Sequence, residues 1–102
     1  MDIWFLYLIR CADGSLYTGI TTDIKRRFIE HREGGRKGSK YLRGKAPLAL
    51  VLKRKIGTKS LALKVEHIVK RMTKTEKEMF VSGKINMRHI NHKLTKHQTK
   101  GD

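Results

Sequence analysis

Acidic residues are scarce in this sequence. Its 102 residues hold 24 lysines and arginines against 9 aspartates and glutamates, which gives a formal net charge of +15. So large an excess indicates a polyanionic partner, and it favours nucleic acid over an anionic membrane surface. A surface charged only for solubility is the weaker alternative, because the acidic residues are too few to balance the basic ones.

Cysteines and long apolar runs are also scarce. The single cysteine, Cys11, excludes an internal disulfide and suits a reducing compartment. The apolar run at residues 3–9 is too short to span a bilayer, and it has neither the basic flank nor the cleavage site of a signal peptide. We therefore expect a cytoplasmic protein without membrane contact. The length favours one domain, and no repeat or linker divides it.

The first third of the chain predicts a β-hairpin. Residues 3–9 are rich in aromatic and branched side chains, which is typical of a buried strand. The Asp-Gly pair at residues 13–14 is a strong turn signal, since both residues tolerate positive φ. Residues 16–21 then return as the second strand. Tyr7 and Tyr17 therefore lie on neighbouring strands, and they face each other if the register allows it.

A helix follows the hairpin, with Thr22 or Asp23 as its N-cap. Arg27 and His31 lie four residues apart, so they stack on one flank of this helix. The hairpin and the helix together can bring two phenols, a guanidinium and an imidazole to one edge of the sheet.

The segment after this helix is basic and rich in glycine. Residues 34–46 hold five lysines and arginines, and Ser39 can cap a short helix within them. We interpret the segment as a mobile loop over the sheet whose Lys40, Arg43 and Lys45 contact a phosphate backbone. An ordinary solvated connection is an equally good alternative.

A third strand is predicted at residues 48–56 and a long helix at residues 59–73. The core-facing stripe predicted for this helix consists of Leu61, Val65, Ile68 and Met72, widened by Ala62 and Val69.

Glu66 lies at the edge of that apolar stripe. It is the only acid between Gly34 and Thr75, a span with thirteen lysines and arginines. One alternative is a surface ion pair with Lys70, one turn further on, and the residues by themselves favour it. The other is a ligand to a hard divalent cation, which often binds one carboxylate together with waters and substrate phosphate.

The end of the chain predicts one more short helix and a tail. Thr75 and Glu78 have capping-box spacing at the start of a helix over residues 75–81. From residue 84 the apolar pattern fades, so we expect residues 84–102 to be a flexible basic tail. Metal binding by this tail is a minor alternative, because no cysteine or acid is near its histidines, His89, His92 and His97.

Taken together, these residues resemble the GIY-YIG nuclease superfamily, and in particular its small stand-alone single-domain members. Its first motif is matched by Phe5-Leu6-Tyr7, in which the tyrosine is identical, and its second by Tyr17-Thr18-Gly19, in which the tyrosine and glycine are identical. Arg27 and His31 follow at the spacing of the family, and the acidic residue of the family falls on Glu66. Each short motif is weak evidence, whereas their order and spacing together are specific.

The resemblance and the predicted elements agree on an α/β fold. We expect a small three-stranded antiparallel sheet flanked by helices, in the order ββααβαα, with residues 1–83 as the nuclease domain.

The resemblance implies a divalent-metal-dependent endonuclease that hydrolyses phosphodiester bonds in DNA, with DNA repair and selectivity for DNA structure as options. Tyr7, Tyr17, Arg27 and His31 would be the catalytic residues, with either tyrosine as the base, and Glu66 would hold Mg²⁺ or Mn²⁺. RNA is not excluded, and a partner protein can supply specificity. The runner-up is a non-catalytic basic nucleic-acid-binding module on the same fold. A basic protein of a ribonucleoprotein is a weaker third option.

Overall fold

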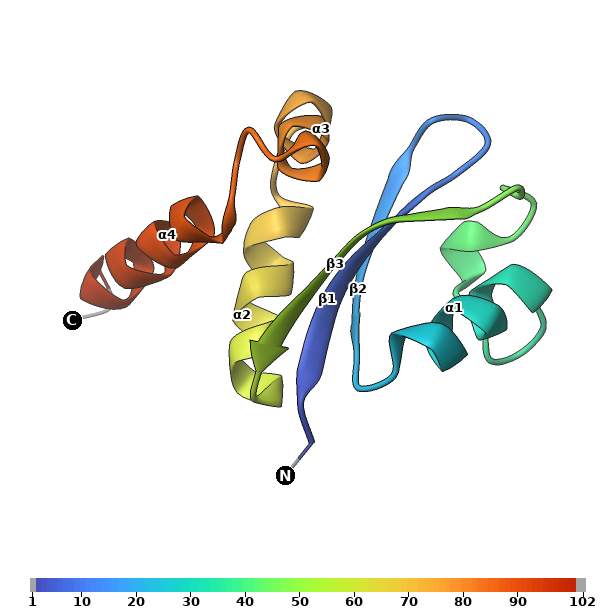
Figure 1. Ribbon diagram of the computed structural model, residues 1–102, viewed down its shortest axis with the longest axis horizontal. Coiled ribbons are helices and arrows are strands. Elements are labelled where there is room, and N and C mark those ends of the chain that lie inside the picture. The colour runs from blue at the N-terminus through green and yellow to red at the C-terminus, as the bar shows by residue number, and fades with distance from the viewer. Residues whose placement is uncertain (1, 101–102) are drawn as a thin grey trace.

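The computed structural model describes residues 2–100, and the side chains as far as Leu94. Figure 1 shows the elements, which are β1 (Trp4–Arg10), β2 (Leu16–Thr21), α1 (Ile24–Glu33), the short 3-10 helix η1 (Lys40–Leu42), β3 (Ala49–Gly57), α2 (Lys59–Lys70), α3 (Lys74–Ser82) and α4 (Met87–Lys100). No helix in this part of the chain is long and apolar enough to cross a membrane.

The three strands form one antiparallel sheet in the order β2-β1-β3, which confirms the predicted fold class. In this register Tyr7 lies opposite Gly19, and Ile9 lies opposite Tyr17. The two tyrosines are therefore diagonal neighbours on one face of the sheet rather than a directly opposed pair.

Helices cover both faces of the sheet, and the central strand β1 contributes to a core on each side. Because side chains alternate along a strand, Leu6 and Leu8 point to one face while Tyr7 and Ile9 point to the other. The first face packs against α2, α3 and α4, and the second against α1 and η1 (Figure 1).

The N-cap of α3 lies two residues before the predicted one. The capping box consists of Thr73 and Glu76, whereas the sequence suggested Thr75 and Glu78 with the same spacing. Glu78 is thereby left to form a bidentate ion pair with Arg10, with distances of 2.6 and 2.7 Å. The Arg10 guanidinium lowers the pKa of Glu78 to about 2. This pair ties α3 to the end of β1.

The buried face of α2 is rotated relative to the predicted stripe. Its buried residues are Ala62, Val65 and Val69, whereas Leu61 is 38% exposed and Ile68 is half-buried. Met72 is also buried, but it lies after the end of α2 at Lys70, within the longer helix predicted for residues 59–73. The stripe prediction was therefore wrong for Leu61. The reason is that α2 presents its small and β-branched residues to the sheet, which allows a close approach to β1 and β2.

Helix α4 departs from the expected flexible tail. Ile90 is fully buried and Leu94 is 9% exposed, and both belong to the same core as α2. Asn86 Oδ1 accepts hydrogen bonds from the backbone N–H groups of Arg88 and His89, at 2.9 and 3.3 Å, which starts the helix. Because the apolar stripe is only two residues wide in a basic and polar segment, it was overlooked in the sequence. The side chain of His97 lies outside the described residues.

Replacing Ile90 by alanine is expected to destabilise the protein by about 2–5 kcal/mol, because a fully buried aliphatic side chain is removed and a cavity remains. Chemical denaturation monitored by circular dichroism measures this change. His92→Ala, at an exposed position of the same helix, is the matched control and should leave stability within about 0.5 kcal/mol. Equal stabilities of the two variants would show that α4 does not pack in solution.

Candidate active site

The Tyr7 side chain reaches across the edge strand of the sheet. Tyr7 is 2% exposed, and its ring lies over Gly19 of β2. A Cβ atom at residue 19 would lie 2.4 Å from Tyr7 Oη and 2.5 Å from Tyr7 Cζ, distances that no real contact allows. Gly19 is therefore needed at this position to make room for the Tyr7 ring. The hydroxyl of Tyr7 is thus placed beside β2 and α1.

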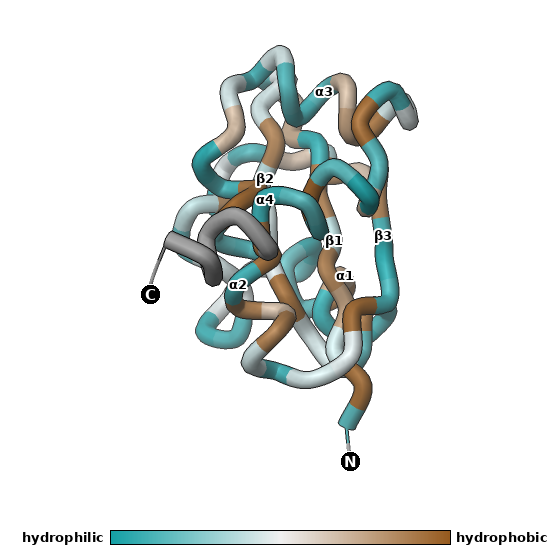
Figure 2. Tube along the Cα trace, turned by 90° about the vertical axis from the view of Figure 1, so that its left-hand side faces the viewer, coloured by the Kyte–Doolittle hydropathy of each residue, from teal (hydrophilic) through white to brown (hydrophobic). Residues whose placement is uncertain are grey.

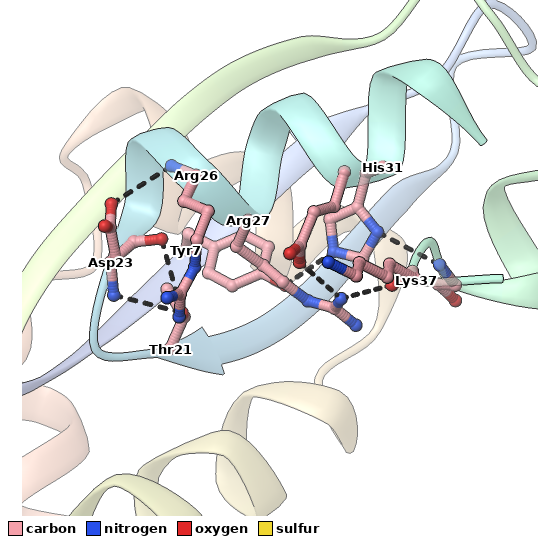
Figure 3. Close-up of polar contacts among 9 residues, drawn as sticks. Tyr7, Thr21, Asp23, Arg26, Arg27, His31 and Lys37 are labelled. Carbon is pink, nitrogen blue, oxygen red and sulfur yellow. Dashed lines mark hydrogen bonds and ion pairs between the residues drawn. The ribbon is translucent and has the colours of Figure 1, made fainter. Parts of the chain in front are cut away.

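His31, in the last turn of α1, fixes that hydroxyl. The backbone N–H of Ser39 donates to His31 Nδ1 at 3.1 Å, so a neutral imidazole must carry its proton on Nε2. The Nε2–H group then donates to Tyr7 Oη at 2.8 Å (Figure 3). Burial, helped by the charge of Arg27, lowers the pKa of His31 to about 4, which keeps the ring neutral near pH 7. The Tyr7 oxygen accepts this bond, and its own proton remains available for another acceptor.

Arg27 lies one turn before His31 on α1. Its Nη1 donates to Glu30 Oε1 at 3.0 Å and to the backbone carbonyl of Lys37 (Figure 3). Burial lowers the pKa of Arg27, but the contacts with Glu30 and Tyr7 outweigh that effect and raise it. The guanidinium is therefore charged and held in place, and its Nη2 and Nε groups carry further donors for an anion.

Tyr17 and Tyr41 extend the cluster toward the surface. The Tyr17 ring centroid lies 6.3 Å from that of Tyr7 and 5.4 Å from that of His31. Tyr41 of η1 is 48% exposed and stacks on Tyr17 at 5.8 Å, and Lys45 Nζ lies 3.8 Å from its ring centroid. Tyr41 was not predicted to be part of the site. The signal it carried was an aromatic residue within a basic loop segment.

Glu66 lies on α2, which packs against the other face of the sheet from Tyr7. Its side chain is 18% exposed, and its Oε2 lies 3.4 Å from Lys70 Nζ, so the surface ion pair is formed. The negative charge of Glu66 also helps to raise the pKa of Tyr7, so the carboxylate belongs to the electrostatic surroundings of that phenol. Among the described residues, no group of three or more histidines, cysteines or acids could hold a metal ion. The residues fit a divalent cation held by one carboxylate, with waters and substrate phosphate completing its shell.

The pKa of Tyr7 is raised above the ordinary tyrosine value. Burial is the largest cause, followed by Tyr17; Arg27 lowers the pKa and Glu66 raises it slightly. Tyr7 is therefore a neutral phenol at pH 7 in the absence of further positive charge. Additional positive charge near Tyr7 would lower its pKa and so favour the phenolate.

The structure places the three predicted phosphate contacts in and around η1. Lys40 and Arg43 are exposed, and Arg43 donates to the backbone carbonyl of Gly35 at 3.2 Å. Lys45 is half-buried between the Tyr41 ring and the carboxylate of Asp13, which is 3.7 Å from its Nζ. Lys45 is thus the one of the three that lies against the aromatic cluster.

The lowered pKa of His31 makes stability depend on pH. The folded-state pKa of about 4 lies below the ordinary value of 6.5, so acid protonates this histidine in the unfolded chain first. The stabilising effect of a neutral His31 is complete above pH 6.5 and is lost as the pH falls toward 4. His31→Gln should therefore lose less stability than the wild type over this range in denaturation measurements. Exposed His67, replaced by glutamine, should keep the wild-type slope, whereas parallel curves for His31→Gln would contradict the neutral imidazole.

Comparisons with known proteins identify the family of this chain. Residues 3–79 match the family described as the GIY-YIG catalytic domain. The chain is 55% identical over 82 residues to the UPF0213 protein YhbQ of Escherichia coli (strain K12), covering 80% of each chain. It is 56% identical over 80 residues to a UPF0213 protein of Enterobacter sp. (strain 638), covering 78% of this chain and 76% of that one.

Two solved structures share the fold. The UPF0213 protein BH0048 from Bacillus halodurans is 39% identical, with a TM-score of 0.52 over 90% of this chain and 96% of that one. The protein EF2693 from E. faecalis is 34% identical, with a TM-score of 0.57 over 81% of this chain and 86% of that one. The motif residues, the sheet that carries them and these matches lead to one conclusion: the chain belongs to the GIY-YIG family, and its domain is of the nuclease type.

Proposed function

We propose that this protein is a divalent-metal-dependent endonuclease that hydrolyses phosphodiester bonds in DNA. The observation that carries the proposal is the hydrogen bond from His31 Nε2–H to Tyr7 Oη, with the tautomer set by Ser39. A buried tyrosine that serves only to pack the core needs one hydrogen bond for its hydroxyl. Here the phenol is also coupled to the charge of Arg27, which lowers its pKa, and to the more weakly acting charge of Glu66, which raises it, and such coupling suits proton transfer and phosphate binding.

We infer a role for each residue from its position. Arg27 would bind a non-bridging phosphate oxygen, because its fork can donate two bonds at once. His31 would hold the Tyr7 oxygen and stabilise its phenolate as an N–H donor. Tyr7 would take the proton of the attacking water or orient it, with Tyr17 as the alternative base. Arg27 lowers the pKa of Tyr7, and a base role needs that effect.

Glu66 would hold the cation. A bound Mg²⁺ or Mn²⁺ would supply positive charge for the phosphate and acidify a water. The ion pair with Lys70 is compatible with this role. The Lys70 side chain is 55% exposed, so a pair at 3.4 Å contributes little free energy and is easily exchanged.

A non-catalytic nucleic-acid-binding module on the same fold is the second candidate. The charge of +15 supports it as well as it supports a nuclease. We favour the enzyme because the chain matches the GIY-YIG catalytic domain and because Arg27, beside the buried Tyr7 and His31 pair, has donors free for a phosphate.

A cleavage assay tests the proposal. Purified protein is incubated with supercoiled plasmid, single strands, flaps, junctions and matched RNA, with Mg²⁺, with Mn²⁺ and with chelator. We expect cation-dependent cleavage of at least one DNA substrate, and its loss in Tyr7→Phe, Tyr17→Phe or both. Wild-type protein that binds DNA but cleaves no substrate with either cation would favour the binding module.

DNA affinity should fall steeply as the salt concentration rises. Lysines and arginines that bind phosphates displace the cations condensed on the duplex, and high salt opposes that release. Replacing Lys40, Arg43 and Lys45 together by glutamine should flatten the plot of log K against log salt, by up to about 0.9 for each phosphate that the variant no longer neutralises. Fluorescence anisotropy with a labelled duplex measures the slope. The matched control replaces Lys55, Lys77 and Lys84, which lie outside the loop. An equal change in both triple variants would mean that the loop has no special part in binding.

A further inference from the structure

Two side chains of the candidate site are held by the same short stretch of backbone. The carbonyl of Lys37 accepts a hydrogen bond from Arg27 Nη1. The N–H of Ser39 donates to His31 Nδ1 at 3.1 Å. Figure 3 shows both side chains reaching from α1 toward the backbone at Lys37. The segment of residues 37–39 therefore orients the guanidinium and the imidazole together.

Gly38, the middle residue of this segment, touches α1. A Cβ atom at residue 38 would lie 2.9 Å from the carbonyl oxygen of Glu30 and 3.4 Å from the Cα and carbonyl oxygen of Gly34. These are backbone atoms of the last turn of α1 and of its C-cap, so they cannot swing aside as the end of a side chain would. The φ of Gly38 lies outside the left-handed region, so the requirement for glycine is one of space.

Contacts further along the loop fix the position of this segment. Leu42 is 3% exposed and belongs to the core cluster that contains Tyr7. Arg43 Nη2 donates to the backbone carbonyl of Gly35 at 3.2 Å, which closes the loop. A segment that is fastened on both sides can hold the groups it contacts at fixed positions.

We propose that Gly38 is a positioning residue, which lets one backbone segment hold Arg27 and His31 at once. A loop that served only to end α1 would be expected to donate to the free carbonyls at that end of the helix. Instead the Ser39 N–H meets an imidazole, and the Lys37 carbonyl meets a guanidinium. The catalytic benefit rests on the proposed function, whereas the positions of the two side chains can be measured without cleavage.

Gly38→Ala tests the proposal. Its Cβ would push the segment away from Glu30 by several tenths of an ångström, and the bond of 3.1 Å between Ser39 and His31 is already long. We expect His31 to lose its fixed Nε2–H tautomer and the Ser39 amide to exchange with solvent at least about tenfold faster. Nitrogen NMR of the imidazoles and amide hydrogen exchange measure these changes. A loss of global stability alone would not change the tautomer in the folded protein.

Gly35→Asn is the matched control in the same loop. Nothing lies within 4 Å of a Cβ at residue 35, and asparagine tolerates the positive φ there better than most residues. It should leave the His31 tautomer and the Ser39 exchange rate unchanged. Exposed His67 on α2 and His92 on α4 lie on the near side of the sheet in Figure 2, whereas α1 lies behind it. They are internal references in the same spectra.

Cleavage rates connect these positions to catalysis. Gly38→Ala should lower kcat about a hundredfold, because catalytic groups are displaced. Its affinity for DNA should change by less than about threefold, since no charge is lost. Gly35→Asn should cleave at the wild-type rate. Wild-type protein that cleaves nothing contradicts the proposed function, while the tautomer and the exchange rate still decide the role of Gly38.

The proposal is overturned if wild-type His31 carries its proton on Nδ1, or if Gly38→Ala keeps the wild-type tautomer. It is also overturned if Gly38→Ala loses the tautomer but keeps the wild-type kcat. If Gly38→Ala does not fold, His31→Gln decides. Glutamine offers no acceptor at the position of Nδ1, so the Ser39 amide should lose its protection, and retained protection would show that Ser39 does not bind His31.

Discussion

Replacing Glu66 by glutamine should abolish cation-dependent cleavage while DNA affinity stays equal or rises. Glutamine keeps the size of the side chain and removes the negative charge that a hard cation requires. Because Glu66 is the one acid in a long basic stretch, its removal also takes away one repulsion toward phosphates. A loss of more than about a hundredfold in rate is expected, on the scale of removing one charged group from the transition state. Gel assays give the rate, and anisotropy gives the affinity.

Lys70→Gln is the matched control for Glu66. It breaks the same ion pair, which spans 3.4 Å, but leaves the carboxylate in place. If Glu66 serves only as a partner of Lys70, the two variants should behave alike, and both effects should be small because the pair is near the surface. If Glu66 holds the cation, Lys70→Gln should cleave at or above the wild-type rate. Titration calorimetry with Mn²⁺ gives an independent readout, since heat of binding should vanish only in Glu66→Gln. Unchanged cleavage in Glu66→Gln would rule out the metal role.

Local signals were sufficient to predict most of the fold. The Asp-Gly turn and the cap at Asp23 each act within a few residues, so the hairpin and the start of the first helix were predicted closely. Helix α4 was missed because its evidence is tertiary. Ile90 and Leu94 become informative only once α2 offers them an apolar surface, and a basic segment gives no local sign of that surface.

In the candidate site, too, some residues were predicted from local signals and others depend on tertiary structure. Tyr7, Arg27 and His31 were predicted to converge because one hairpin and one short connection fix their relative positions. Ser39 was expected only as a helix cap, and Tyr41 only as part of a short helix. The backbone N–H of Ser39 meets His31 because the loop folds back over α1, a path that no pattern in residues 34–46 specifies. The tautomer of His31 is thus a product of tertiary structure.

Gly19→Ala tests the position of the Tyr7 ring directly. The added Cβ would lie 2.4 Å from Tyr7 Oη and 2.5 Å from Cζ, so the ring must move or the strands must separate. The ring has little freedom, because Tyr7 is 2% exposed and its oxygen is held by His31 at 2.8 Å. A displacement of about 1 Å at a catalytic group can cost about a hundredfold in rate. We expect a loss of at least that size and a destabilisation of about 1–3 kcal/mol from overpacking.

Thr18→Val is the matched control for Gly19→Ala. It changes the neighbouring residue on the opposite face of β2, where the described structure leaves Thr18 Oγ1 buried without a hydrogen-bond partner. Valine has nearly the same shape and no hydroxyl, so stability should be unchanged or slightly higher. A double-mutant cycle then identifies the cause, because in a Tyr7→Ala background the Gly19→Ala substitution should become less destabilising by about 0.5–3 kcal/mol. If the two substitutions are additive and Gly19→Ala cleaves DNA at the wild-type rate, the Tyr7 ring does not occupy this position in the active enzyme.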